Sequence, residues 1–190
     1  RGDPLEGRRG LVETSMTKPA ASSPEVVVRV SGFVKCYKQH LAVDRLDLTV
    51  KRGEIYGLIG PDGAGKSSVM KAIAGVLRYD GGSAEVFGTL VDSERAAERV
   101  KPRIGFLPQG LGLNLYPELS VEENIDFFAR LRLVPEPELR ARKSRLLAIT
   151  RLDRFRSRLM KQLSGGMKQK LGLICTLIHE PELAILDEPT

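Results

Sequence analysis

Cysteine and histidine are scarce in this sequence, which has two of each among 190 residues. Cys36 and Cys175 lie far apart in apolar surroundings, so we expect reduced thiols of a cytosolic protein and no disulfide framework. The cysteines have no metal-binding spacing, and His40 and His179 are isolated. A cysteine or histidine metal centre is therefore not expected, and both histidines are predicted to be surface or partly buried residues.

Long apolar runs are missing too. The longest candidate, residues 171–178, falls far short of the about 20 residues that span a bilayer and contains a glycine, a cysteine and a threonine. The first residues have no apolar segment typical of a signal peptide. With 42% hydrophobic and 28% charged residues, the chain is predicted to be one soluble domain, with room for an inserted subdomain.

Acidic residues are outnumbered, 24 against 30 lysines and arginines, which gives a net charge of +6. The excess is concentrated between Arg140 and Arg158. Such charge suits nucleic acid or an anionic membrane surface. A solvated helix face also explains it and is the preferred interpretation.

Residues 1–24 are rich in Gly, Pro, Ser, Thr and charge, which predicts a disordered tail. A folded domain is expected over 25–190, with a helical subdomain at about 110–170. Ser120 and Glu123 form a capping-box pattern ahead of a helix. The periodicity predicts strands at 26–30, 46–50, 54–59, 84–88, 103–107 and 183–186, and helices at 68–77, 94–100, 121–131, about 138–149 and from Ser164 onward.

The most informative stretch is 60–67, which reads G-x-x-x-x-G-K-S, the phosphate-binding loop pattern. An apolar segment before it and a helical pattern after it supply the strand–loop–helix context of that motif. Its glycines let backbone N–H groups close around phosphate oxygens. Lys66 is placed to contact the β- and γ-phosphates, and the Ser67 hydroxyl to bind Mg²⁺.

Two acidic residues, Asp187 and Glu188, follow the apolar strand at 183–186. Next to a phosphate loop, carboxylates at this place suit Mg²⁺ and an attacking water. Because successive strand side chains point to opposite faces, we expect the two carboxylates to have different roles.

Ser164, Gly165 and Gly166 begin a helix. Ser164 is a natural cap, but each glycine at a helix start costs about 0.5–1 kcal/mol relative to alanine. Two interpretations stay open on this pattern alone: an ordinary helix-start turn, or a backbone that something must approach closely.

Taken together, these motifs resemble those of the ATP-binding cassette (ABC) ATPases. Residues 60–67 resemble the Walker A motif of that family, and Gln109 its Q-loop glutamine. Residues 163–169, Leu-Ser-Gly-Gly-Met-Lys-Gln, resemble its signature motif, and 183–188 its Walker B motif with the adjacent glutamate. Tyr37 stands where the family has an adenine-stacking aromatic. The resemblance implies an α/β fold: a P-loop NTPase core with an antiparallel β subdomain and an inserted α-helical subdomain.

The resemblance also implies a role for each motif residue. Glu188 would be the general base, and Lys66 and Gln109 would be the other catalytic residues. Mg²⁺ would be held by Ser67 and Gln109, with Asp187 acting through water. ATP would be bound by Tyr37, Gly60, Pro61, Asp62, Gly63, Ala64, Gly65, Lys66, Ser67 and Ser68, and ATP held by an opposite subunit by Ser164, Gly165 and Gly166.

This implies a head-to-tail dimer of two ABC domains, joined to transmembrane permease subunits on the cytoplasmic face of the plasma membrane. Asp62 and the Met-Lys-Gln ending of the signature resemble ATPases of ABC-2 type exporters, in some of which two cassettes are fused and Asp marks the first. A soluble ABC ATPase acting on ribosomes or DNA is the alternative, although no direct nucleic-acid contact is expected. Phe106, Leu115, Tyr116 and Phe127 are candidates for the permease groove, with core packing as the competing role.

The family's D-loop and switch histidine follow Walker B and are not among the 190 residues. Residues 1–190 by themselves are therefore expected to bind nucleotide weakly and not to turn over normally.

Overall fold

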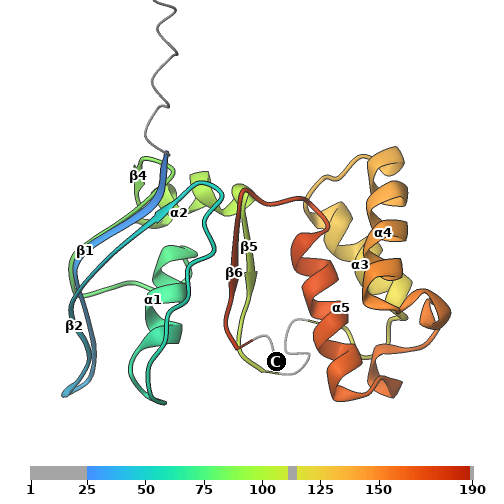
Figure 1. The fold of residues 1–190 in the computed structure, drawn as a ribbon, viewed down its shortest axis with the longest axis horizontal. Coiled ribbons are helices and arrows are strands. Elements are labelled where there is room, and N and C mark those ends of the chain that lie inside the picture. Colours follow the sequence, from blue (N-terminus) through green and yellow to red (C-terminus); the bar gives the residue numbers. More distant parts are fainter. Residues whose placement is uncertain (1–24, 111–114, 189–190) are drawn as a thin grey trace, which may run out of the picture.

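The protein was analysed as a computed structural model, which describes residues 25–110 and 115–188. The expected disordered tail at 1–24 lies outside the described residues. The described chain has an antiparallel sheet at one end, three helices at the other, and a pair of parallel strands between them (Figure 1). The predicted mixed α/β architecture with an antiparallel part and a helical part is confirmed.

The antiparallel sheet has four strands in the order β2-β1-β3-β4. Its two long strands form a hairpin whose turn, Lys38–Gln39, places Lys38 at φ 55. The predicted strands at 26–30 and 46–50 are the apolar parts of these longer strands, and Val28, Val30 and Phe33 are fully buried. The strands are β1 (Val26–Tyr37), β2 (His40–Lys51), β3 (Gly81–Val86) and β4 (Thr89–Leu90).

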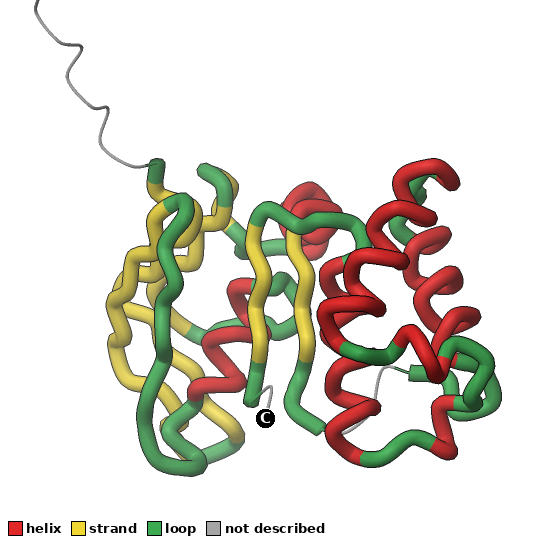
Figure 2. The backbone as a smooth tube through the Cα atoms, turned by 45° about the vertical axis from the view of Figure 1, so that its right-hand side comes forward, coloured by secondary structure: helices red, strands yellow, loops and turns green. Residues whose placement is uncertain are grey.

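A second sheet holds only two parallel strands, β5 (Ile104–Leu107) and β6 (Leu183–Leu186), which pair from Ile104 with Leu183 to Leu107 with Leu186. Both views show them beside helix α1 on one side and the helical region on the other (Figures 1 and 2). Side chains of the antiparallel sheet, α1 and this pair share one hydrophobic core. The helices of this part are α1 (Lys66–Ile73) and α2 (Glu94–Val100), followed by the 3-10 turn Lys101–Arg103.

The helical region has a core of its own, in which Ile125, Leu147 and Ile174 are fully buried. The predicted capping box is present: the Ser120 hydroxyl accepts from the Glu123 N–H, and the Glu123 carboxylate accepts from the Ser120 N–H. Among the described residues, no helix is long and apolar enough to cross a membrane. The helices are α3 (Val121–Leu131), α4 (Glu136–Thr150) and α5 (Gly165–Leu177), with 3-10 turns at Asp153–Phe155 and Met160–Gln162.

The strand predicted at 54–59 is wrong. The segment is irregular, and Ile55 and Ile59 are 100% and 96% exposed. A strand requires a partner for its backbone N–H and C=O groups, and no described residue supplies one here. The segment instead forms one wall of an open cavity of about 750 Å³, of which β6 forms the opposite wall. An apolar pattern does not by itself supply the neighbouring strand.

The helix predicted at 68–77 is also shorter than expected. It ends at Ile73, because Gly75 adopts φ 70, a left-handed conformation that a helix does not continue through. The two cysteines are free, as predicted. Burial raises the pKa of the Cys175 thiol, which keeps it protonated and unreactive.

Candidate functional site

Four segments that lie far apart in the sequence meet around one cavity of about 410 Å³. They are the β1–β2 hairpin, the loop before α1 with the start of that helix, the chain just after β5, and the chain just after β6. The cavity is lined by Tyr37, His40, Ala42, Asp62, Gly63, Ala64, Gly65, Lys66, Ser67, Ser68, Gln109 and Glu188. Most residues that the motifs single out for nucleotide are thus brought together.

The loop before α1 depends on its glycines for its shape. Gly63 and Gly65 adopt φ 79 and φ 81. A Cβ on Gly65 would lie 2.3 Å from Val43 Cγ2 and 2.8 Å from the Ala42 carbonyl oxygen, a spacing that no side chain tolerates. Glycine is therefore required at this position both for its backbone conformation and for its close packing against β2.

Lys66 reaches back over the loop. Its Nζ donates to the carbonyl oxygens of Gly60 and Pro61, at 2.9 Å each. These bonds hold the ammonium group beside the open start of α1, whose first N–H groups lack partners within the helix. A charged ammonium next to free N–H donors is the arrangement that binds phosphate.

Tyr37 enters the cavity from the hairpin. Its hydroxyl lies 3.0 Å from the buried Ser68 Oγ, and its ring is 45% exposed. Sequence reasoning missed His40 and Ala42 as cavity residues. The available signal was the short turn after Tyr37: a two-residue turn pairs Tyr37 with His40 across the hairpin, which places them side by side.

Gln109 and Glu188 meet at the end of the parallel strand pair. Gln109 Nε2 donates to Glu188 Oε2 at 2.7 Å. They come together because β5 and β6 are parallel neighbours, so the residues that follow them emerge at the same edge. Glu188 adopts φ 49, an uncommon conformation for a residue with a side chain.

Asp187 differs sharply from its neighbour. It is 1% exposed, and neither carboxylate oxygen has a hydrogen-bond partner among the described residues. Its backbone N–H is bonded to the Leu107 carbonyl at 2.9 Å. Burying an unpartnered carboxylate is costly, so this group suits a bound cation or ordered water. The predicted difference between Asp187 and Glu188 agrees with this contrast in burial.

These residues fit a magnesium ion held jointly by protein and nucleotide. Within the described ranges, no group of three His, Cys, Asp or Glu residues forms a metal site alone. Mg²⁺ commonly takes one or two protein ligands, with substrate phosphates and water completing its shell. The Ser67 hydroxyl, the Gln109 amide oxygen and Asp187 provide a set of that kind.

The serine-glycine turn of 164–166 lies elsewhere, at the start of α5. Ser164 is the helix cap, and its Oγ accepts from the Met167 N–H at 3.4 Å. All three residues are exposed, and none lines the cavity. A Cβ on Gly166 would meet nothing within 4 Å. Packing within the described chain therefore gives no reason for glycine at this position.

Comparison with known proteins shows the family of the chain. Residues 43–190 match the protein family described as "ABC transporter", and the chain belongs to that family. It is 43% identical over 168 residues to the probable multidrug ABC transporter ATP-binding protein YbhF of Escherichia coli (strain K12). The aligned region covers 87% of this chain and 28% of YbhF. The chain is 34% identical over 164 residues to the Nod factor export ATP-binding protein I of Ralstonia nicotianae, covering 86% of this chain and 50% of that protein.

Among solved structures, the chain resembles the dimeric post-hydrolysis state of the ATP-binding cassette MJ0796 bound to ADP and Pi. The TM-score is 0.76 at 26% identity, over 86% of this chain and 74% of that one. The aligned part of the chain spans 28% of the length of YbhF and 50% of that of the Nod factor export protein. The activity of the whole protein is therefore considered next as a proposal.

Proposed function

We propose that this chain is the ATP-binding and ATP-hydrolysing domain of an ABC exporter, formed by residues 25–190 with a helical subdomain at about 110–170. The observation that carries the proposal is the cavity at which Lys66, Gln109 and Glu188 meet, next to Asp187, which is buried and has no hydrogen-bond partner among the described residues. This combination supplies a phosphate grip, a metal shell and a base in one place.

ATP binding uses the hairpin and the loop. Backbone N–H groups of 60–65 and of the first turn of α1 would contact the phosphates, while Lys66 would exchange its two carbonyl partners for phosphate oxygens. The exposed Tyr37 ring would stack on adenine. Its bond to Ser68 ties the ring to the helix that carries the phosphate-binding residues.

Hydrolysis uses the carboxylates. Glu188 is exposed at the cavity and would orient and deprotonate the attacking water, with Gln109 holding its side chain in place. Ser67, Gln109 and Asp187, the last through water, would hold Mg²⁺. The ion, when bound, neutralises charge on the β- and γ-phosphate oxygens.

The second ATP-binding surface would come from another ABC domain. Ser164, Gly165 and Gly166 are exposed at a helix start and do not line the cavity of their own chain. In a head-to-tail dimer, they would contact the γ-phosphate of ATP bound by the partner domain. The dimeric structure of MJ0796 supports the pairing of two such domains.

A permease would dock beside α3. Tyr116, Phe127 and Phe128 form an aromatic cluster, with ring centroids of Tyr116 and Phe127 4.6 Å apart, and both rings are more than a third exposed. Of the other two groove candidates, Leu115 is buried in the helical core and Phe106 packs against the main core. We therefore keep Tyr116 and Phe127 as the contact residues, with the domain on the cytoplasmic face of the plasma membrane.

The nucleic-acid alternative loses part of its support in the structure. Basic residues of α4 are paired with acids, among them Arg142 with Glu138 and Glu180, and Lys143 with Glu122 and Asp126. Among the described residues, the exposed Arg151, Arg154 and Arg158 of the same basic stretch form no ion pair. Charge that is neutralised inside the protein is not available to phosphate backbones.

The test is phosphate release by the purified full-length polypeptide with Mg-ATP, measured with and without its membrane partner in liposomes. Hydrolysis that requires Mg²⁺ and is stimulated by the permease supports the exporter. ATP binding without hydrolysis, or salt-sensitive binding to ribosomes or DNA, contradicts it.

A further inference from the structure

The short β5–β6 pair has a side-chain pair at each of its ends. Arg103 bonds Glu182 just before the strands, and Gln109 bonds Glu188 just after them. Both pairs join residues 79 positions apart, and the ladder between them, Ile104 with Leu183, has the same separation. The two pairs therefore belong to a single register of the strands.

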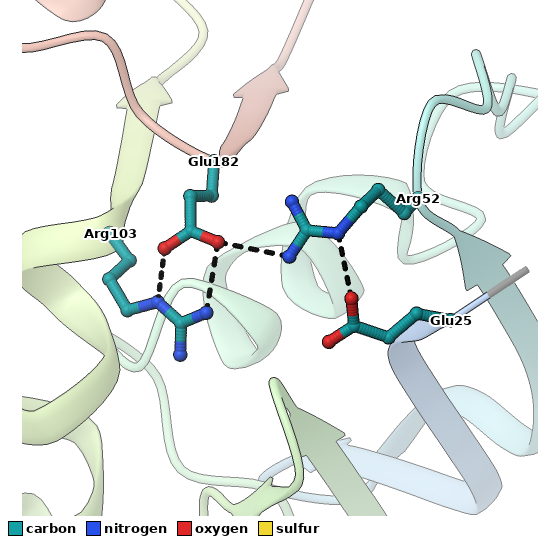
Figure 3. Close-up of polar contacts among 4 residues, drawn as sticks. All are labelled: Glu25, Arg52, Arg103 and Glu182. Atoms are coloured by element: carbon teal, nitrogen blue, oxygen red, sulfur yellow. Dashed lines mark hydrogen bonds and ion pairs between the residues drawn. The ribbon is translucent and has the colours of Figure 1, made fainter.

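The Arg103–Glu182 pair is bidentate (Figure 3). Arg103 Nε donates to Glu182 Oε1 at 2.5 Å and Nη2 to Oε2 at 2.9 Å. The Glu182 N–H also donates to the Arg103 carbonyl at 2.9 Å, and the guanidinium lies 3.8 Å from the centre of the Phe87 ring. Such a fork has one favourable geometry, so it discriminates between registers more strongly than a single contact would.

The strands themselves specify their register weakly. They read Ile-Gly-Phe-Leu and Leu-Ala-Ile-Leu, apolar on both faces, as parallel strands between covering layers usually are. A slip by one residue moves a strand about 3.3 Å and reverses its faces. Gly105 sets β5 against α5, because a Cβ there would lie 2.7 Å from the Thr176 carbonyl oxygen. That Cβ would also lie 2.8 Å from Pro181 Cγ, just ahead of β6, so Gly105 allows close packing there but makes no directional bond that distinguishes one register from another.

We propose that the Arg103–Glu182 pair sets the register of β6 on β5 and so positions Glu188 beside Gln109 at the cavity. Its effect on hydrolysis rests on the proposed function. Arg103 and Glu182 are positioning residues, since neither lines the cavity.

Arg52 extends this link to the phosphate loop. Its Nη2 donates to Glu182 Oε2 at 3.0 Å and its Nε to Glu25 Oε2 at 2.8 Å (Figure 3). Arg52 starts the segment that leads to Gly60. The Glu182 carboxylate thus connects the first residues of three segments, 52–66, 103–109 and 182–188. The last residues of these segments are Lys66, Gln109 and Glu188.

A role in register is separable from a role in stability. Arg103 and Glu182 are 40% and 37% exposed, and surface pairs contribute little to the free energy of unfolding. The adjacent Arg103 and Arg52 lower the pKa of Glu182 to about 2, so the pair stays charged at neutral pH.

The test uses Glu182→Arg, Arg103→Glu and the double variant in the full-length polypeptide. Each single variant is expected to lower kcat for ATP hydrolysis about tenfold. Arg103→Glu leaves Arg52, the link to the phosphate loop, in place, so its Kd for ATP should change by less than about twofold. The double variant is made in an Arg52→Ala background, because Arg52 lies 3.0 Å from the Glu182 carboxylate and would repel an arginine introduced at 182. In that background the fork is restored with reversed charges, and kcat should recover to within about threefold of the Arg52→Ala protein. The matched control is Glu118→Lys, which breaks the exposed ion pair with Lys161 and should leave kcat unchanged.

Single variants with wild-type kcat, or a double variant that does not recover, would overturn the proposal. So would a melting temperature that falls in step with kcat, because that indicates a structural role only. If the wild type hydrolyses no ATP, the proposed function fails but the register does not. A crystal structure of Glu182→Arg then decides it: the Gln109–Glu188 bond, 2.7 Å here, should be lost, and its retention refutes the proposal.

Discussion

The sheet region around α1 and the helical region of α3–α5 differ in where their candidate functional residues lie. In the first, residues from β1, the phosphate loop, β5 and β6 converge on one concave cavity. In the second, Ser164, Gly165 and Gly166 lie on an exposed helix start, and the aromatic residues Tyr116 and Phe127 lie on an open surface. Each region has its own hydrophobic core.

This difference indicates how the work is divided. The sheet region contains, within one chain, the groups proposed to bind phosphate and activate water. The helical region contributes exposed surfaces that are proposed to bind other molecules. Variants in the two regions should therefore fail in different ways, which the following experiments in the full-length polypeptide test.

The largest effect is expected in the sheet region, from Lys66→Ala. Removing the ammonium deletes charged hydrogen bonds to the phosphates, each worth about 1.5–3 kcal/mol, so the Kd for ATP should rise about 100-fold or more. A nucleotide titration by calorimetry measures this. Lys71→Ala, on the same helix but outside the cavity lining, is the control, and normal affinity in Lys66→Ala would refute the loop assignment.

Glu188→Gln should separate binding from turnover. Loss of a general base lowers the rate by about 10²–10⁴-fold, while the Kd for ATP stays close to wild type. An ATP-bound dimer should then accumulate, which gel filtration with Mg-ATP detects. Glu94→Gln, exposed at the start of α2, is the control, and undiminished turnover would reject Glu188 as the base.

Ser164→Arg tests the helical region. A long cation at the helix start should block contact with a partner domain, so turnover and the ATP-dependent dimer should be lost while a single domain still binds ATP. Ser157→Arg, an exposed serine of the same region, should have no effect. A dimer that still forms with Ser164→Arg would count against the clamp.

Leu147→Ala sharpens the comparison of the two cores. Leu147 is fully buried among α3–α5, and a large-to-small change in a core costs about 2–5 kcal/mol in the free energy of unfolding. Because the cavity lies in the sheet region, which has a separate core, the Kd for ATP of the folded variant should stay near wild type. Denaturant unfolding monitored alongside nucleotide binding measures both, and a parallel loss of affinity would show that the cores are coupled.

The smallest effect concerns pH. The pKa of Glu182 falls from its ordinary 4.5 to about 2 because Arg103 and Arg52 bond it. The stabilisation is fully present above pH 4.5 and is lost as the pH falls from 4.5 toward 2. Its loss on acidification should be absent in Glu182→Gln, which a comparison of acid unfolding curves tests. Identical curves would contradict the assignment.

The local elements followed from the sequence because each is encoded within a few residues. The capping box of Ser120 and Glu123, the strand at 183–186 and the glycine loop were all predicted with their places in the chain. The segment 54–59 was not, because its apolar pattern needs a neighbouring strand that no local rule provides. His40 was overlooked because its place in the cavity comes from pairing across the hairpin.

By itself, the sequence determined which residue types could hold phosphate and metal, because Gly65, Lys66, Ser67 and the adjacent carboxylates act through local backbone shape and charge. Only the tertiary structure decided that the buried Asp187 carboxylate has no hydrogen-bond partner among the described residues while Glu188 accepts from Gln109. It also decided that the serine-glycine turn is exposed and does not line the cavity. Those facts depend on which strands lie side by side and in what register, and register arises from contacts between residues about 80 positions apart.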